Sequence, residues 1–427
     1  AQLDLALPAR VQQFLAAGEE RHRALRRRRR IRYGVAAAAL SGAAIFAFIW
    51  IGRYLERERL IRVNAGTLDL VLEPYDRIGG RMVPVTISDL PSFWLALHAT
   101  APGDPHTPGR AIPDHLVEIL RVSTAGSRRT VRIRAPGGMA FLAIHGRGRR
   151  GETCAPSWIR IQAFPGYTEM AEPKTYEVQV PTCQATRDDT IPIEAGPFVY
   201  GGPGQPPSQL YGVDPDYTED RHIITLPEYR IDQMEISNAM FEPFARLEKL
   251  TGYPAPIYSN EPIHLHDGDP EYPVTEIDAF EAEAFCRYMG KQLPSDHQWT
   301  KAARGGLMSH GQKNPLPERL FPWGATPSPR CANLEGLEDG YRWVAPVTEF
   351  KCGASPDGVL NLGGNVLEWI SREGQTDKDK MLHYALRGGA ADSPPQLEHA
   401  STIFRNHSDP RAVSYSVGAR CVEVTSP

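Results

Sequence analysis

The side chains in this sequence with the greatest capacity for redox or metal chemistry are its six cysteines and a few of its histidines. Thiolates bind soft metal ions, and paired cysteines form disulfides in oxidising compartments. Imidazole also binds metal ions. The candidate imidazole ligands are His264 and His266, the latter beside Asp267, with His399 and His407 further along. Lone histidines on loops are more often solvated, so a metal centre built from them is the weaker reading.

A basic cluster near the N-terminus precedes a long apolar stretch. Arg26 to Arg30 lead into Gly34 to Gly52, which contains no charged residue. About 19 helical residues just cross a hydrocarbon core of ~30 Å, and Trp50 would suit the interface. A buried core helix rarely tolerates charge clusters at both ends, and a signal peptide needs a small-residue cleavage site that residues 51–54 do not offer. The sequence therefore predicts a basic stub over 1–32 and a transmembrane helix over 33–53, and a membrane boundary explains the basic cluster without a nucleic-acid partner.

The charges on the two sides of this stretch predict an orientation. More arginines precede it than follow it, which places the N-terminus in the cytoplasm under the positive-inside rule. We therefore expect a single-pass protein of the cell inner membrane whose later residues are extracytoplasmic, in the periplasm. The first residue is Ala1, so the chain is either a processed product or part of a longer protein.

Residues 63–190 have a β-rich pattern. Polar and apolar residues alternate in short runs separated by Gly and Pro, which is typical of strands. The runs are 68–72, 130–134, 158–161 and 176–180. They predict a small antiparallel β-sandwich that serves as a spacer or a recognition module. Cys154 and Cys183 both fall here; a disulfide between them and two free thiols are both open.

Residues 191–427 contain few and short helical patterns between long irregular stretches. Capping-box residues and C-terminal glycines mark helix boundaries. The expected helices are Ala279–Met289 after Asp278, Trp299–Arg304 after Ser295, and one that starts at Ser237 or Asn238 and stops at Gly252. Such a domain needs something beyond helix and sheet hydrogen bonds to hold its loops.

A series of short motifs runs through these residues in a fixed order. They are Ile191–Phe198, Glu235–Asn238, Tyr272–Val274, Phe285–Cys286, Gly290–Pro294, Ala302–Gly306, Phe321–Gly324, Asn361–Trp369, Leu386–Gly389 and Val417–Cys421. In content and order they resemble the formylglycine-generating enzymes, also called sulfatase-modifying factors. The resemblance implies an α+β fold related to C-type lectins over 191–427, preceded by the small β-sandwich and the single transmembrane helix.

Members of this family hold structural calcium, and the resemblance implies two calcium sites here. Calcium binds carboxylate, amide and backbone carbonyl oxygens. One set would be Asn333, the carbonyl of Leu334, Asp339 and the carbonyl of Tyr341; the other would be Asn361, the carbonyls of Gly364 and Val366, and Glu368. The alternative is that these polar residues only cap turns.

The resemblance also implies that the copper centre of the active family members is missing from this chain. Active members bind copper(I) through two cysteines five residues apart, just after the Arg-Gly-Gly segment. The corresponding stretch, Ala390–Asp409, contains no cysteine, and none lies between Cys352 and Cys421. We therefore expect no copper and no cysteine oxidation. Cys286 and Cys421 match a disulfide of some members, whereas Cys331 and Cys352 have no assignment.

Three functions remain open. The favoured one is a membrane-anchored, sensor-type protein that binds a protein or peptide ligand and has no catalytic residues. Its groove would lie within 390–416, with Arg405, Asn406 and Asp409 as candidate contacts. Related domains occur in bacterial signalling proteins, which makes a cytoplasmic signalling module upstream a further expectation. The alternatives are a formylglycine-generating oxidase or related metal-dependent enzyme of altered chemistry, and a structural or assembly component of a membrane complex.

Overall fold

The computed structural model describes most of the chain from residue 66 onward. The described residues are 27, 51–52, 66–98, 118–121, 129–135, 138–152, 154–163, 174–202, 221–251, 268–309, 311–336, 339–371, 384–394 and 397–424. Residues 65–427 form one compact unit, and residues 1–64 form another. His264, His266 and Asp267 lie outside the described residues, as does the predicted stub over 1–32 apart from residue 27.

The predicted membrane localisation is contradicted. No helix among the described residues is long and apolar enough to cross a bilayer. The segment 33–53, on which the prediction rested, falls outside the described residues except for Ile51 and Gly52. The prediction used mean apolarity and flanking charge alone.

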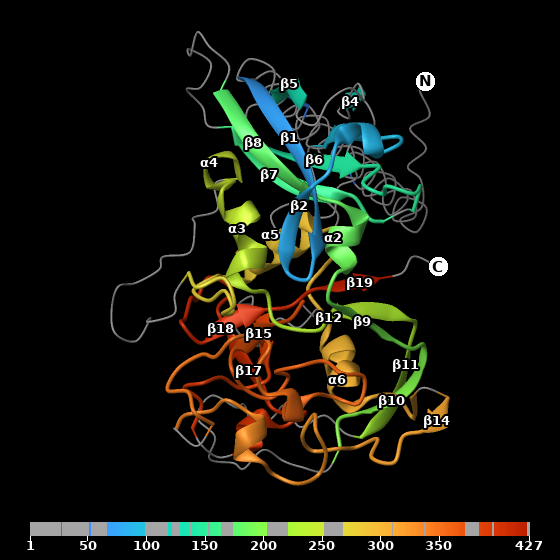
Figure 1. The fold of residues 1–427 in the computed structure, drawn as a ribbon, viewed down its shortest axis with the longest axis vertical. Coiled ribbons are helices and arrows are strands. Elements are labelled where there is room, and N and C mark those ends of the chain that lie inside the picture. The colour runs from blue at the N-terminus through green and yellow to red at the C-terminus, as the bar shows by residue number, and fades with distance from the viewer. Residues whose placement is uncertain are drawn as a thin grey trace, which may run out of the picture. The chain divides into compact units, whose positions relative to one another are not determined.

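Two four-stranded sheets form the first part of the unit (Figure 1). In the first sheet, β1 (Gly66–Ile78) pairs with β2 (Arg81–Pro84), β5 (Arg129–Ala135) and β8 (Lys174–Pro181). The second sheet has the order β4 (Glu118–Arg121), β3 (Trp94–His98), β6 (Gly138–His145) and β7 (Ser157–Ala163). A single 3-10 turn, η1 (Ile87–Asp89), lies between β2 and β3.

The first sheet is mixed, whereas the sequence predicted antiparallel strands. β8 runs parallel to β1, with Leu72 opposite Val178. Alternation of polar and apolar residues fixes which side chains share a face, but it is the same for either strand direction. Buried residues of both sheets, such as Leu72 and Leu142, belong to one hydrophobic core. The arrangement of the two sheets as a sandwich stays a prediction.

α5 (Ala279–Tyr288) begins at the predicted residue, whereas α6 (Asp296–Arg304) begins directly after its predicted cap Ser295, three residues before the predicted Trp299. Both helices start with complete capping boxes. The third predicted helix is split into α3 (Asn238–Ala245) and α4 (Glu248–Thr251). At the break, the N–H of Leu247 bonds to the carbonyl of Phe244, so the chain tightens into a 3-10 turn. A further short helix, α2 (Cys183–Arg187), links the two parts.

Short strands complete the second part. β12 (Tyr229–Asp232) lies between β9 (Thr190–Ile193) and β19 (Val422–Val424), so the first and last strands of this part share one partner (Figure 1). A four-stranded sheet has the order β17 (Arg405–Ser408), β16 (Tyr384–Arg387), β15 (Leu367–Trp369) and β18 (Val417–Ala419). Two hairpins remain, β10 (Gly196–Tyr200) with β11 (His222–Leu226) and β13 (Met308–Ser309) with β14 (Gln312–Lys313).

The core is continuous across both parts. Phe241, Phe285 and Met289 from the helices belong to the same buried cluster as the two N-terminal sheets. The hydroxyl of Tyr288 donates to the carbonyl of Gln179 at 2.7 Å, and the hydroxyl of Ser157 donates to the carbonyl of Tyr288. These contacts place α5 against β7 and β8.

A buried arginine, Arg420, holds the strands of the second part together. Its guanidinium has no exposed surface and pairs with Glu368 on β15, at 2.6 and 2.8 Å. Its remaining N–H groups donate to three backbone carbonyls, those of Asp232, Gln233 and Leu360. All five N–H donors of this side chain are therefore used.

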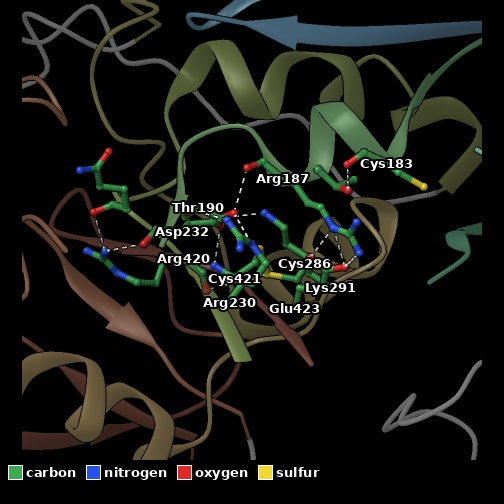
Figure 2. A network of polar contacts seen from close by, with 12 residues as sticks. Cys183, Arg187, Thr190, Arg230, Asp232, Cys286, Lys291, Arg420, Cys421 and Glu423 are labelled. Atoms are coloured by element: carbon green, nitrogen blue, oxygen red, sulfur yellow. Dashed lines mark hydrogen bonds and ion pairs between the residues drawn. A yellow bond between two sulfur atoms is a disulfide. The ribbon is translucent and has the colours of Figure 1, made fainter. Parts of the chain in front are cut away.

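Arg420 belongs to a wider polar network between β12 and the chain's end (Figure 2). Lys291 forms a buried ion pair with Asp232, whose other oxygen accepts the N–H of Cys421 at 2.9 Å. Cys421 is joined to Cys286 of α5 by a disulfide. Arg187, at the end of α2, pairs with Glu423 of β19 at 2.7 Å.

Replacement of Arg420 by Lys should destabilise the protein by about 3–5 kcal/mol, because a point charge leaves Glu368 and two or more carbonyls poorly paired. Denaturant unfolding of both proteins measures this difference. The matched control is Arg246→Lys, since Arg246 pairs with Glu242 on the surface, where exposed pairs contribute at most ~1 kcal/mol. Equal losses in the two variants would contradict the assignment of Arg420 as the central contact.

Candidate functional site

Three asparagine side chains and one glutamate form a buried polar cluster that includes two of the predicted calcium ligands, Asn333 and Asn361. Glu235 accepts hydrogen bonds from the amide groups of Asn361 and Asn365, at 2.8 and 3.0 Å. Asn365 in turn accepts from the amide of Asn333 at 2.9 Å. Asn361 and Asn365 both have left-handed backbones, which asparagine tolerates better than most residues. The cluster thus joins the loops of both predicted calcium sets.

Within this cluster, two oxygen atoms lack a hydrogen-bond donor among the described residues. They are the side-chain oxygens of Asn333 and Asn361, both buried. A buried acceptor without a partner costs about 1–3 kcal/mol. A hard cation would satisfy each of them.

The first predicted calcium set contains oxygen atoms of the types that bind calcium. Asn333 contributes its unpaired oxygen, and the carboxylate of Asp339 lies on the same loop, where one oxygen accepts the N–H of Tyr341 at 2.9 Å. A hard, oxygen-seeking cation is suited to amide and carboxylate oxygens of this kind. The carbonyls of Leu334 and Tyr341 belong to the same loop.

The second predicted set fits less well. Asn361 has an unpaired oxygen, but Glu368 already accepts from Arg420 through both carboxylate oxygens and from the indole of Trp299 at 2.8 Å. The guanidinium of Arg420 neutralises the carboxylate of Glu368, whose negative charge a bound cation would need. The role of Glu368 in this arrangement is therefore the ion pair with Arg420.

The loop after Arg387-Gly388-Gly389 is a tight turn. Gly389 has a φ of 74°, and a side chain there would meet the carbonyl of His399. The hydroxyl of Ser393 accepts the N–H of Ala390 at 2.9 Å, and its carbonyl accepts the N–H of Glu335. This loop therefore packs against the loop of the first calcium set.

The three predicted groove residues have different surroundings. Arg405 is 9% exposed, with its guanidinium 3.0 Å from Asp296. The side-chain oxygens of Asn406 and Asp409 accept backbone N–H groups, from His407 and Arg411. Arg405 is thus a partner of a buried carboxylate, which the loop position in the sequence did not indicate.

Asp296 is the centre of a buried cationic cluster. Arg387 and Arg405 pair with its carboxylate, and Tyr200 donates to it at 2.8 Å. Burial alone would raise the pKa of Asp296, but the two guanidinium groups lower it below its usual value. The cluster anchors β16 and β17 to the start of α6.

Aromatic side chains line the surface beside the tight turn. The rings of Trp343 and Tyr415 lie edge to face, 5.7 Å apart, and Arg342 lies 5.5 Å above the ring of Trp343. Burial and then the neighbouring Asp392, which accepts a hydrogen bond from the Tyr415 hydroxyl, raise the pKa of Tyr415. The sequence analysis did not identify this surface; the available signal is the pair of aromatic residues Tyr341 and Trp343 after an acidic loop.

All six cysteines are paired in the structure. The disulfides are Cys154–Cys183, Cys286–Cys421 and Cys331–Cys352. The first two match the pairs named from the sequence, and the third had no assignment. His399 is buried beside Phe404, and His407 lies on β17. In the described part of the chain, no three His, Cys, Asp or Glu side chains are grouped so as to hold a metal ion.

Glu235 gives the buried cluster a pH dependence. Burial raises the pKa of this carboxyl from its usual range to about 7. A raised carboxyl pKa means that the folded state binds the proton more tightly, so this group lowers stability as pH rises from about 4.5 to 7.

The free energy of unfolding should therefore fall across this window by an amount on the order of 3 kcal/mol from Glu235 alone. Glu235→Gln should flatten this part of the pH profile, measured by denaturant unfolding at several pH values in calcium-free buffer. Glu242→Gln, at an exposed position, is the matched control. Identical profiles for Glu235→Gln and the unchanged chain would refute this account.

Comparison with known proteins finds the same family that the sequence motifs resemble. A family model described as a sulfatase-modifying factor enzyme 1-like domain matches residues 175–425, which begins within β8. The inactive C-alpha-formylglycine-generating enzyme 2 of Bos taurus is 32% identical over 164 residues, or 35% of this chain and 50% of that protein. The hercynine oxygenase of Mycolicibacterium smegmatis is 27% identical over 266 residues, or 52% of this chain and 58% of that protein.

Among solved structures, PvdO from Pseudomonas aeruginosa is 19% identical, covers 55% of this chain and 93% of that chain, and has a TM-score of 0.40. The chain spans about half the length of the two curated relatives described above. The family match covers more than half of the 427 residues and includes every motif from Ile191 to Cys421. This chain therefore belongs to the sulfatase-modifying factor family, which includes the formylglycine-generating enzymes.

Proposed function

We propose that this protein is a ligand-binding member of the family that does not oxidise cysteine and that recognises a protein or peptide. The observation that carries the proposal is the state of its cysteines. The loop from Ala390 to Asp409 has none, and all six cysteines of the chain are engaged in disulfides elsewhere. Copper(I) requires soft thiolate ligands, and this loop supplies none.

The surface formed by Trp343, Tyr415 and Asp392 is the proposed contact region. Trp343 and Tyr415 are partly exposed, and aromatic side chains of this kind contribute much of the binding energy at protein interfaces. Arg342 and Asp392 add one charge of each sign at its border. Asn406 is half-buried and Asp409 is exposed, so both stay candidate contacts, whereas Arg405 is buried in its pair with Asp296.

The relatives include proteins with and without named activity. The name of the Bos taurus relative calls it inactive, and the mycobacterial relative is named an oxygenase. An enzyme of altered chemistry is therefore the second candidate, and a stoichiometrically bound transition metal would favour it. Stable co-purification with one partner would instead favour an assembly component.

We also propose that calcium binds the first set of oxygen ligands, Asn333, Leu334, Asp339 and Tyr341. The supporting observation is the buried, unpaired oxygen of Asn333, together with the carboxylate that Asp339 supplies on the same loop. Bound there, calcium would neutralise Asp339 and hold the loop that carries Trp343. The second set is not proposed, because Glu368 is paired with Arg420.

The intact mass of a substrate peptide tests whether this chain oxidises cysteine to formylglycine. A peptide containing Cys-x-Pro-x-Arg should remain unchanged after incubation with the full chain, copper and oxygen, while an active family member converts it fully. If the peptide is not converted, the next experiment is a search for ligands that bind the surface of Trp343, Tyr415 and Asp392. Conversion of the cysteine to formylglycine would overturn the proposal, since it would show that the fold builds the oxidase site without the two cysteines.

Chelation should lower the melting temperature of the full chain. Saturation at about 100 times the dissociation constant stabilises a protein by ~2.7 kcal/mol. Asn333→Ala should remove the response to calcium, and Asn361→Ala should keep it, although both substitutions lower basal stability. A melting curve that a chelator leaves unchanged, or a calcium response that survives in Asn333→Ala, would count against this site.

A further inference from the structure

The disulfide between Cys331 and Cys352 differs from the other two in its exposure. Cys352 is exposed and Cys331 is half-buried. By contrast, Cys286 and Cys421 have no exposed surface, and Cys183 is 1% exposed. An incoming thiolate must approach a disulfide sulfur directly, so access decides which disulfide is attacked first. Cys154 is half-buried like Cys331, so Cys352 is the one cysteine of the three disulfides that is exposed.

Its surroundings favour thiolate chemistry. The hydroxyl of Ser328 donates to the sulfur of Cys331 at 3.3 Å. Two exposed cations, Arg330 and Lys351, immediately precede the two cysteines in the chain. Hydrogen bonds and neighbouring cations stabilise a thiolate, which makes Cys331 a good leaving group when Cys352 is attacked.

The disulfide closes the loop 332–351 at a strained turn. Cys352 lies in a short 3-10 turn, η7 (Lys351–Gly353), that begins after Phe350. Phe350 has a φ of 54°, a left-handed conformation that is unfavourable for a bulky side chain. Such a residue persists only where its surroundings hold it. The crosslink between η6 (Pro329–Cys331) and η7 is one of the constraints that hold it.

We infer that Cys331–Cys352 is a thiol–disulfide exchange site, reduced by a dithiol, that controls the order of the loop 332–351. One thiolate of the reductant attacks the sulfur of Cys352 and forms a mixed disulfide, and the bond to Cys331 breaks. Cys331 leaves as a thiolate and takes a proton from solvent. The second thiol of the reductant then attacks its own sulfur in the mixed disulfide and releases Cys352. Two electrons and two protons pass to the protein, and the reductant becomes a disulfide.

The loop connects this site to the proposed function. It carries Asn333 and Asp339 of the proposed calcium site, and Trp343 of the proposed contact surface. The amide of Asn333 donates to the carbonyl of Trp343 at 2.9 Å, so the two features share one backbone segment. Resting on that function, the inference is that reduction weakens both calcium binding and ligand binding.

The chemistry is tested without calcium or ligand. The full chain is incubated with dithiothreitol under native conditions, and free thiols are alkylated at timed intervals and mapped by peptide mass. Cys331 and Cys352 should become labelled at least about tenfold faster than the buried pair Cys286 and Cys421. Ser328→Ala should slow their labelling several-fold, whereas Ser88→Ala, at an exposed serine of the first part, should not. Equal labelling rates for the two disulfides would overturn the exchange site.

Hydrogen–deuterium exchange tests the effect on the loop. The double variant Cys331→Ser/Cys352→Ser should exchange faster than the unchanged chain over residues 332–351. The matched double variant Cys154→Ser/Cys183→Ser should leave exchange in that loop unchanged. Unaltered exchange in the first variant would overturn the control of the loop, and it would do so whether or not the protein binds calcium or a peptide.

Discussion

The rest of this structure depends on the buried ion pair between Arg420 and Glu368. The guanidinium of Arg420 is placed where ion pairing must compensate for its lost hydration, and Glu368 does so while three carbonyls use the remaining donors. These partners belong to β15, to the end of β12 and to the segment before Asn361. Strands as short as β15 and β18 form few ladder bonds. The buried pair therefore fixes positions that sheet hydrogen bonding alone leaves weakly determined.

The loops above this pair depend on it through shared residues. Glu368 follows Asn361 and Asn365 on one segment, and these asparagines join Glu235 to the loop that carries Asn333. The same loop contacts the turn around Ser393 and presents Trp343 to Tyr415. Rigid buried groups thus support a surface whose own residues are partly exposed. This arrangement allows the surface to vary in sequence while the fold persists.

Much of this could be predicted from sequence where a local pattern has one structural meaning. Asp278 with Glu281 and Ser295 with Gln298 specify helix starts, and the ordered motifs specify the family. Other features depend on distant partners. The alternation of polar and apolar residues does not show that β8 runs parallel to β1. The burial of Arg405 depends on Asp296, which is 109 residues earlier in the chain. Apolar content at 34–52 predicted a membrane span that the described residues do not support.

The pairing of β12 with both β9 and β19 has a consequence for synthesis on the ribosome. Arg420 and Cys421 are made after the residues that they pair with, which are Asp232, Glu368 and Cys286. Cys286 must therefore wait as a thiol while 135 residues are added, and Cys331 and Cys352 emerge during that interval. Closure of the 331–352 pair within that interval leaves Cys286 free to form its native disulfide with Cys421.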